Sequence, residues 1–436
     1  MADIYPFRGL RYSLRQIPIQ NVVTQPYDKI SKEMQDRYYA LHPNNIIRIV
    51  LGKVTPEDST ENSVYTRAAR FLKDWRSTGI LEQLSAPAFF VYFQRFMIPG
   101  ASEVRLRKGF VGLARLEDYA NKVVFPHERT LTGPKKDRLE LLRHTRTHFE
   151  QIFMLYEDPA QRIDRVLEEA ANLKPDIDVE DEFGVTHTVW TVSDPKTITL
   201  IQEQMADKKL IIADGHHRYE TALAYRDEMR AKYGVTPEAP YERLTMTFFN
   251  MDSPGLTILP THRVLSGLAG FESKSFLERA GQFFDVSIVP ADAERLRSDL
   301  KRLGEERVTI GVAADAGRSC SLLRLKPSLD LASVLPDLSQ KQRTLDVVVL
   351  HRLIIEKCLG VAEDAVKKER HITYVRELDK ALNAVNSSDA QVAFLLNATR
   401  LEQMRDIAYE GNVMPQKSTD FYPKVLSGLM MYTLED

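Results

Sequence analysis

Continuous and alternating apolar runs predict a series of strands in the first half of the chain. Residues 89–98 (FFVYFQRFMI) and 108–119 (KGFVGLARLEDY) are rich in β-branched and aromatic side chains, as strands are, and residues 99–107 between them are typical of a hairpin connection. The strands predicted in this half are residues 89–98, 108–119, 151–158, 186–192, 209–214 and 242–252.

Helical periodicity appears between these strands. Residues 137–150 place Leu139, Leu142 and Phe149 near one face, and residues 216–232 place Tyr219 and Ala222 on an inner stripe. Strands interleaved with helices are typical of an α/β or mixed α+β fold, and they disfavour a helical bundle or a β-sandwich.

The same mixture repeats on a smaller scale after residues 256–268. Strands are predicted at 307–314, 321–326, 371–377 and 391–397, and helices at 276–284, 293–304, 345–360, 378–386 and 399–411. The helix at 345–360 ends at Gly360, a usual C-terminal cap. We therefore predict two domains, a larger one at 1–265 and a smaller α+β domain at 266–436.

Composition narrows the functional classes. The chain has 436 residues, 59 Lys+Arg against 61 Asp+Glu and a net charge of -2, which disfavours duplex nucleic acid or an anionic membrane as a partner. No stretch approaches the roughly 18 apolar residues of a membrane span. Cys320 and Cys358 have no metal-ligand spacing and suit a reducing compartment, while Asp3 and Pro6 interrupt any secretory signal. We predict a cytoplasmic protein.

The strongest candidate site is the DGHHR segment at 214–218, where a buried strand is predicted to meet a helix. The first backbone N–H groups of a helix and its dipole together favour an anion. His217 and Arg218 add side-chain donors, and a guanidinium can bind two phosphate oxygens at once. Gly215 would let the backbone approach the ligand closely. We include His216 in this predicted phosphate site.

Two carboxylates border the predicted phosphate site. Asp214 could hold a metal ion or take a proton from a hydroxyl, and Glu220 is a second candidate for that base. The plainer alternative is that the histidines cap the helix and Asp214 pairs with Arg218. Adjacent helical residues point about 100° apart, so His216 and His217 would not easily share one metal ion.

A second cluster lies at residues 125–142. His127 and Glu128 are catalytic candidates, and Lys136 and Arg138 gather where a helix is expected to begin. Because the helix dipole disfavours cations there, a bound anion would explain them. A solvated basic loop is the alternative.

Residues 411–428 carry a third cluster, Lys417, Ser418 and Thr419. These residues imitate the end of a Walker A loop, but the glycines and the preceding strand are missing, so a P-loop NTPase is rejected. We predict that this turn closes over a ligand, with a docked C-terminal tail as the alternative.

Polar residues near the N-terminus form a fourth, weaker cluster. Tyr27, Asp28, Asn45 and Arg48 stand beside apolar segments and could orient a polar small molecule. Ordinary turn chemistry around Pro26 and Pro43 explains them equally well.

Six motifs in one order resemble a bacterial and archaeal family labelled domain of unknown function 1015. The motifs are QPYDKI, HPNNIIRI, HERT with KKDRLELL, IADGHHRYETALAYR, LPTHRVL and MPQKSTDFYPK. The resemblance spans essentially the whole chain.

The short segment ADGHHRYETA also resembles the ParB and sulfiredoxin-like superfamily, which includes free serine kinases and DNA-segregation nucleotidases. This resemblance implies a ParB/sulfiredoxin-like nucleotide-binding core, with Gly215, His217 and Arg218 at a phosphate-binding turn. His216 stands where sulfiredoxins carry their reactive cysteine, so sulfinic acid repair is not supported.

The leading hypothesis is a kinase that transfers a phosphoryl group from ATP or ADP, with Mg²⁺, to a small hydroxylated metabolite. The acceptor could be a free hydroxy amino acid such as serine. Phosphoryl transfer needs mainly positioning and charge stabilisation, with a base that orients the hydroxyl. Arg218 and His217 would hold phosphates, Asp214 or Glu220 would orient the acceptor or bind Mg²⁺, and Lys136 or Lys417 would neutralise the transferred group.

Two alternatives remain open. A metal-dependent hydrolase would use His127, Glu128, Asp214 and either His216 or His217, although the sequence has no H-x-H or H-E-x-x-H spacing. A nucleotide-responsive regulatory or DNA-linked protein is disfavoured by the near-neutral charge. The oligomeric state is left open, with a homodimer as one option.

Overall fold

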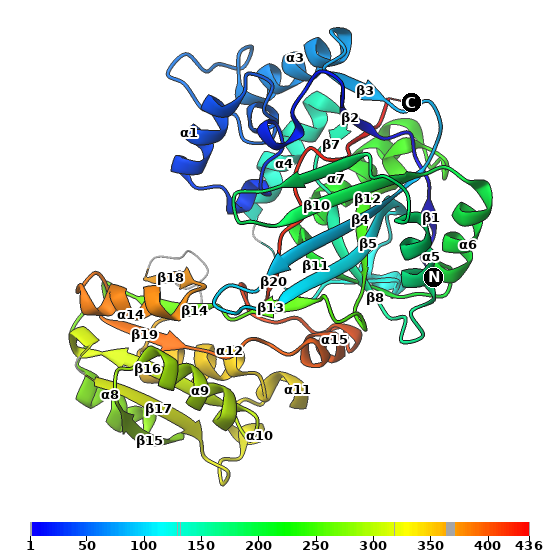
Figure 1. Cartoon of the computed structure of the whole chain (residues 1–436). Coiled ribbons are helices and arrows are strands. Elements are labelled where there is room, and N and C mark those ends of the chain that lie inside the picture. The colour runs from blue at the N-terminus through cyan, green and yellow to red at the C-terminus, as the bar shows by residue number, and fades with distance from the viewer. Residues whose placement is uncertain (1, 129, 131, 318, 363–370, 436) are drawn as a thin grey trace. The chain divides into compact units, whose positions relative to one another are not determined.

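The structure, a computed structural model, describes residues 2–128, 130, 132–317, 319–362 and 371–435. These residues form a mixed α/β fold, which confirms the predicted fold class, and the chain divides into two compact units (Figure 1). Unit 1 comprises Met1–Pro126, Thr130–Thr257 and Tyr422–Asp436, and unit 2 comprises His127–Arg129 and Ile258–Phe421. None of the described helices is long and apolar enough to cross a membrane.

The unit boundaries differ in two ways from the single cut near residue 265. His127 and Glu128 lie in unit 2, where Glu128 forms a parallel bridge with Met414. The chain returns to unit 1 at Tyr422. Local patterning cannot locate segments whose partners lie hundreds of residues away.

A nine-stranded mixed sheet is the centre of unit 1. Its order is β6-β11-β8-β12-β5-β4-β10-β9, and β1 also pairs with β5. Its strands are β1 (Ile4–Tyr5), β4 (Phe89–Met97), β5 (Val104–Arg115), β6 (Val124–Phe125), β8 (Ile152–Tyr156), β9 (Ile177–Glu180), β10 (Thr186–Val192), β11 (Leu210–Asp214) and β12 (Arg243–Asn250). The six strands predicted in this half are all confirmed, although β5 begins at Val104, inside the predicted hairpin connection.

The two faces of this sheet are covered differently. Alternate residues such as Phe110, Met154 and Phe248 face helices α5 (Arg162–Ala170), α6 (Pro195–Met205) and α7 (His216–Tyr233) in one apolar core. Side chains of the opposite parity, including Gln94 and Arg107, point to the other face, where their partners are backbone groups of the returning C-terminal segment.

A second core in unit 1 joins the N-terminal helices to the C-terminal segment. Its residues come from α2 (Ile47–Val50), α3 (Val64–Ser77), α4 (Thr132–Thr145), the strands β2 (Leu10–Tyr12) and β3 (Leu81–Gln83), and the loops beside them, with Phe149 and Met431. Unit 1 also contains α1 (Lys32–Leu41) and the paired strands β7 (Thr147–His148) and β21 (Tyr432–Thr433). The helix predicted at 137–150 is wrong at its end, because residues 147–148 pair with β21 instead of continuing the helix. Arg146, with φ of 45°, stands at the change of direction.

Unit 2 is built on a six-stranded antiparallel sheet of order β15-β17-β16-β19-β14-β18. The strands are β14 (His262–Leu265), β15 (Phe284–Val289), β16 (Thr309–Ala314), β17 (Ser319–Leu325), β18 (Ile372–Val375) and β19 (Val392–Leu395). The helices are α8 (Ser273–Ala280), α9 (Ala293–Gly304), α10 (Leu331–Val334), α11 (Gln340–Arg343), α12 (Asp346–Val349), η6 (Leu350–Cys358), α14 (Leu378–Asn386) and α15 (Leu401–Tyr409). Helices α9 and α14 cover one face of the sheet.

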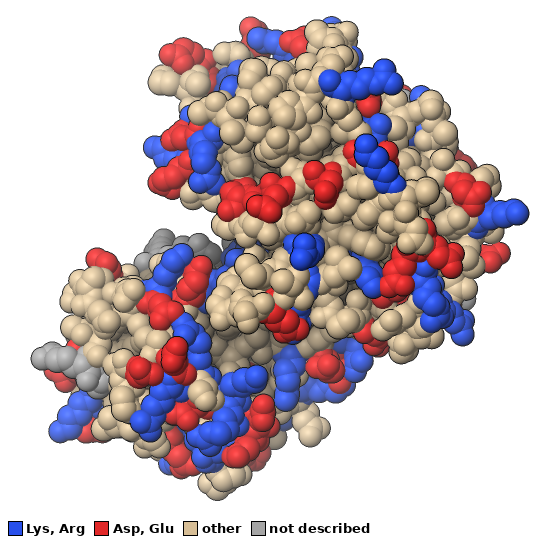
Figure 2. All heavy atoms as spheres, viewed as in Figure 1, with Lys and Arg blue, Asp and Glu red and all other residues tan. Residues whose placement is uncertain are grey.

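The long helix predicted at 345–360 is present as α12 followed by η6, and η6 is wound as a π-helix. Gly360 follows it with φ of 71°, as predicted for a C-terminal cap. Two short strands, β13 (Thr257–Leu259) and β20 (Asp420–Tyr422), pair with each other where the chain passes between units. Figure 2 shows acidic and basic side chains interspersed over the face in view, in keeping with the near-zero net charge.

Candidate functional site

A β-bulge at the end of β11 sets the direction of Asp214. Ile211 and Ile212 pair with Leu155 and Met154 of β8, but the next residue of β8, Phe153, pairs with Asp214 and leaves Ala213 as an extra residue. Directly paired residues share a face of a sheet, so Asp214 lies on the face of Phe153, not on the helix-covered face of Ile212. The bulge therefore turns the carboxylate toward the C-terminal segment.

Gly215 makes the turn from β11 into α7. Its φ of 96° is the left-handed conformation that glycine adopts without strain, and it is the N-cap of an 18-residue helix. A Cβ atom at this position would lie 3.1 Å from both the Arg218 guanidinium and Ile152. The glycine predicted to allow close approach is thus required by the packing of Arg218 beneath the turn.

Two cations converge on the Asp214 carboxylate. Arg218 Nη2 lies 2.7 Å from Oδ2, and Lys424 Nζ lies 2.9 Å from Oδ1. The exposed fractions of the Asp214, Arg218 and Lys424 side chains are 16%, 11% and 7%, so these ion pairs are poorly screened by solvent. Burial alone would raise the pKa of Asp214, but Lys424 and then Arg218 hold that pKa well below its usual range. The cluster carries one net positive charge beside the positive end of the α7 dipole.

A second carboxylate, Glu150, stands on the other side of Arg218. Its Oε1 accepts a hydrogen bond from the Tyr27 backbone N–H at 2.9 Å and one from Ser427 Oγ at 2.8 Å. Burial would lower the pKa of Arg218, but Glu150 and then Asp214 raise it above its ordinary value. The remaining contact of the guanidinium is a hydrogen bond from Nη1 to the Gln151 carbonyl at 2.5 Å.

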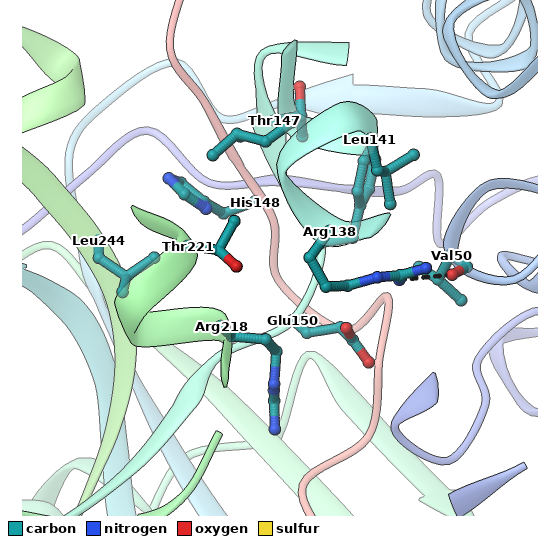
Figure 3. A pocket seen from close by; sticks show the side chains of 11 residues that line it. Val50, Arg138, Leu141, Thr147, His148, Glu150, Arg218, Thr221 and Leu244 are labelled. Carbon is teal, nitrogen blue, oxygen red and sulfur yellow. Dashed lines mark hydrogen bonds between the residues drawn. The ribbon is translucent and has the colours of Figure 1, made fainter. Parts of the chain in front are cut away.

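Glu150 and Arg218 line a small cavity that also receives Arg138 (Figure 3). Arg138 donates to the Val50 carbonyl at 2.6 Å, and its guanidinium lies 4.1 Å from the centre of the Tyr27 ring. The remaining lining residues are Val50, Leu141, Leu142, Thr147, His148, Phe149, Thr221 and Leu244. The cavity has a volume of about 50 Å³, which admits a few waters or a small polar group, but not a nucleoside.

Two of the four predicted substrate-binding residues lie near this cluster and two do not. Tyr27 contacts Arg138 and Glu150, and the charge of Asp28 acts on Arg218. Asn45 is fully buried and serves the backbone, since it donates to the Asn21 carbonyl and accepts from the Ile47 N–H. Arg48 donates to the Tyr39 carbonyl at 2.9 Å, so Asn45 and Arg48 hold the local fold.

Glu220 is engaged away from Asp214. Its Oε2 accepts hydrogen bonds from Thr130 Oγ1 and Lys135 Nζ, both at 2.8 Å. The carboxylate therefore joins α7 to the beginning of α4, and Lys135 already has an anionic partner. Lys136 is exposed on α4. His216 is 8% exposed, and the His217 carbonyl accepts a hydrogen bond from Thr221 Oγ1 at 2.8 Å.

The other predicted residues belong to unit 2 and gather around the segment 414–419. His127 is fully buried, with Nε2 2.7 Å from Thr419 Oγ1, and its carbonyl accepts from the Met414 N–H. Glu128 forms an isolated parallel β-bridge with the same residue, Met414. Ser418 Oγ donates to the Pro415 carbonyl at 2.5 Å, while Lys417, with φ of 57°, offers its carbonyl to Arg263 at 2.8 Å.

A metal ion at Asp214 would compete with two cations for one carboxylate, so we do not carry that assignment forward. Within the described part of the chain, no three His, Cys, Asp or Glu side chains gather in a group that could hold a metal ion. The hydrolase alternative therefore lacks a set of ligands among these residues.

Sequence reasoning missed Glu150, Lys424 and Ser427. Glu150 falls at the end of the helix predicted at 137–150, but the structure places it two residues before the buried strand β8. Lys424 and Ser427 fall inside the segment 411–428, but only Lys417, Ser418 and Thr419 in that segment imitate a phosphate-binding loop. The exposure of Ser427 is 1% and that of Lys424 is 7%, which only the fold reveals.

A family model described as "Protein of unknown function (DUF1015)" matches residues 4–348 of the chain. A comparison with curated proteins found no match. Among solved structures, a free serine kinase in complex with AMP is similar at 12% identity and a TM-score of 0.36, over 73% of this chain and 91% of that chain. A conserved hypothetical protein from Pyrococcus furiosus has 12% identity and a TM-score of 0.36, over 74% and 95%. C-terminally truncated SbnI from Staphylococcus aureus has 10% identity and a TM-score of 0.35, over 75% and 89%.

Proposed function

The chain belongs to the DUF1015 family of proteins of unknown function, and we propose that it is a nucleotide-dependent phosphotransferase acting on a small hydroxylated metabolite. A free hydroxy amino acid such as serine is the first acceptor to test. The observation that carries the proposal is the pair of buried cations on Asp214 at the beginning of α7.

The phosphate donor binds, in this proposal, at the turn from β11 into α7. Arg218 and Lys424 converge on Asp214 there, and the α7 dipole adds partial positive charge, so the turn offers cationic donors to an incoming anion. Arg218 supplies a planar fork that fits two phosphate oxygens, and Lys424 supplies a compact point charge. Asp214 has a depressed pKa, so it orients the two cations and is poorly suited to accept a proton.

The acceptor binds, in this proposal, in the cavity beside Glu150. Glu150 lies between Arg138 and Arg218 on the cavity wall, so its carboxylate can orient a hydroxyl while a guanidinium binds the acceptor's own anionic group. The volume of about 50 Å³ suits a small polar group and leaves the nucleoside outside the cavity. Glu150 thus replaces Asp214 and Glu220 as the proposed base.

ATP or ADP is the proposed donor. Mg²⁺ commonly keeps several waters and binds through substrate phosphates with one or two carboxylates. Since the described residues offer it no ligand cluster, no step of this proposal runs through a protein-bound metal ion.

Isothermal titration with ATP, ADP and CTP in the presence of Mg²⁺ tests the donor site. We expect wild type to bind at least one nucleotide, and Arg218→Lys to bind it at least about tenfold more weakly, because lysine keeps the charge but loses the bidentate hydrogen bonds. Arg115→Ala is the control, since Arg115 is a half-exposed arginine of unit 1 outside the site. Failure of wild type to bind any of the three would overturn the proposal.

A second experiment tests the reaction. Wild type is incubated with ATP or ADP and a pool of hydroxy amino acids, and phosphorylated products are identified by mass spectrometry. A product made by wild type and Arg115→Ala, and lost in Glu150→Gln, supports the proposed base.

A further inference from the structure

The backbone of the segment that carries Lys424 is hydrogen-bonded through three consecutive carbonyls to two buried side chains. Arg107 Nη1 donates to the Tyr422 carbonyl at 3.2 Å, and Nη2 donates to the Pro423 carbonyl at 2.5 Å. Gln94 Nε2 donates to the Lys424 carbonyl at 2.8 Å. Gln94 and Arg107 are neighbours on β4 and β5 and are 0% and 1% exposed.

Arg107 is buried against the rings of Phe153 and Phe249, with its guanidinium 4.6 and 4.5 Å from their centres. Burial lowers the pKa of Arg107 to about 9, because the charged form loses its hydration. A buried cation is tolerated only when its donors are used. Here they are used by the Gln94 side chain and by the carbonyls of the C-terminal segment.

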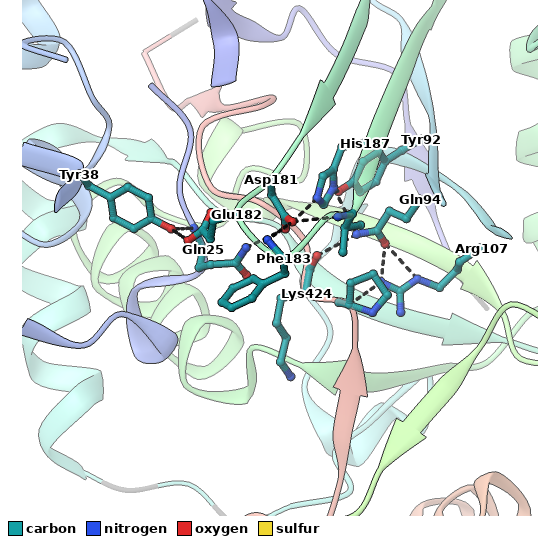
Figure 4. A network of polar contacts seen from close by, with 12 residues as sticks. Gln25, Tyr38, Tyr92, Gln94, Arg107, Asp181, Glu182, Phe183, His187 and Lys424 are labelled. Atoms are coloured by element: carbon teal, nitrogen blue, oxygen red, sulfur yellow. Dashed lines mark hydrogen bonds and ion pairs between the residues drawn. The ribbon is translucent and has the colours of Figure 1, made fainter. Parts of the chain in front are cut away.

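The Gln94 amide has one orientation that satisfies all its neighbours (Figure 4). Its oxygen accepts from Arg107 Nε at 3.0 Å and also from Nη2, so its nitrogen must face the Lys424 carbonyl. The same nitrogen lies 3.4 Å from His187 Nδ1, and His187 is in turn held by Asp181 at 3.2 Å. The network leaves the amide no alternative arrangement.

We propose that Gln94 and Arg107 form a buried clamp that positions Lys424 for binding of the donor's phosphate. This inference rests on the proposed function. A lysine side chain is long and flexible, so its charge is effective at one point only if its backbone is fixed. The clamp fixes that backbone, and Asp214 holds the ammonium at the phosphate site until the anion binds. Gln94 and Arg107 are positioning residues that act through Lys424.

Gln94→Glu is the sharpest variant. The carboxylate keeps an acceptor for Arg107, so the buried cation retains its partner, but an oxygen replaces the N–H that faces the Lys424 carbonyl. Gln94→Leu, which removes both contacts, is the second variant. Gln202→Leu is the matched control, because Gln202 donates to the backbone carbonyl of Ile4 at 2.8 Å in the N-terminal segment of the same unit.

The first readout needs no ligand. Amine-reactive labelling followed by mass spectrometry gives the modification rate of Lys424 relative to Lys73, which is exposed on α3. We expect the relative rate at Lys424 to rise about tenfold or more in Gln94→Glu and Gln94→Leu, and to stay at the wild-type value in Gln202→Leu. An unchanged rate in both Gln94 variants, with unit 1 folded by tryptophan fluorescence, would overturn the clamp.

The second readout separates positioning from general stability. We expect Gln94→Glu and Lys424→Met each to weaken ADP binding about tenfold, and the double variant to bind no more weakly than Lys424→Met alone. Additive losses would overturn action through Lys424. If wild type bound no nucleotide, the proposed function and the role in phosphate binding would both fail, while the labelling rates would still decide whether the clamp exists.

Discussion

Asp214→Asn removes the charge shared by Arg218 and Lys424 while keeping the shape of the side chain. Both ion pairs are short and each partner is at most 16% exposed, so the variant leaves two buried cations facing a neutral amide. Removing one partner of a buried ion pair costs about 3–5 kcal/mol, and the amide oxygen still accepts one hydrogen bond. We therefore expect unit 1 to lose about 3 kcal/mol of unfolding free energy at pH 7.

Tryptophan fluorescence is a suitable assay, because both tryptophans of the chain, Trp75 and Trp190, lie in unit 1. Urea unfolding at pH 7 should show the loss in Asp214→Asn, and Asp36→Asn should unfold like wild type, because Asp36 and its partner Lys53 are solvent-exposed. Adding Lys424→Met to Asp214→Asn removes one of the two cations that face the amide. The loss of unfolding free energy in the double variant should therefore be about 1–3 kcal/mol smaller than the sum of the losses in the two single variants.

The pH dependence has a definite sign. The pKa of Asp214 is depressed in the folded chain, so its stabilising effect is complete above the unfolded value of about 3.9 and is lost as the pH falls below it. The gap between wild type and Asp214→Asn should be constant from pH 7 to about pH 5 and shrink below about pH 4. Equal urea midpoints at pH 7, or strictly additive losses in the double variant, would refute this account of the cluster.

Two further changes test the surroundings of the cluster. Gly215→Ala should destabilise unit 1 by about 2–3 kcal/mol, because it adds a 3.1 Å contact with Arg218 and Ile152 to the strain at φ of 96°. Gly184→Ala is the control and should cost only about 1 kcal/mol, because Gly184 has φ of 72° but open space around it. Equal losses in urea unfolding would contradict the packing role of Gly215. Burial lowers the pKa of His148 to about 3, so the folded chain keeps this imidazole neutral at a pH where the unfolded chain protonates it. The free energy of unfolding is therefore unaffected by His148 above about pH 6.5 and decreases as the pH falls below that value. Wild type should therefore lose up to about 1.4 kcal/mol per pH unit relative to His148→Phe between about pH 6 and pH 4, and parallel pH profiles of fluorescence-detected unfolding would contradict the shift.

The fold class and most strands follow from local side-chain pattern. The prediction at 186–192 coincides with β10, because its Thr, Val and Trp residues are types that favour a strand. Strand order and the return of the C-terminal segment do not follow from local pattern. Lys424 and Gln94 are 330 residues apart in the sequence, and Ser427 and Glu150 are 277 apart. Local periodicity holds no information on such pairings.

The candidate site was predictable where its residues are neighbours in the sequence. Asp214, Gly215 and Arg218 are brought together by one strand-to-helix turn, and their types already indicate an anion site. Glu150 joins them only through the pairing of β8 with β11. Asn45 was predicted to bind substrate, but it accepts a hydrogen bond from a backbone N–H in its own turn. The sequence alone does not distinguish an asparagine with this role from one that binds a ligand.

The bulge at Ala213 makes the direction of Asp214 depend on the register of β11, not on which apolar residues the strand contains. Ile211 and Ile212 could exchange for other apolar residues and the end of β11 would keep its course. If β11 kept its length but lost the bulge, Ala213 would pair with Phe153 and simple alternation would turn Asp214 toward the apolar core beneath α7. Its carboxylate would then be buried without a cation, and Lys424 would lose its partner. A relative of this chain could therefore change every apolar residue of β11 and keep the candidate site, yet lose it if the strand paired without the bulge.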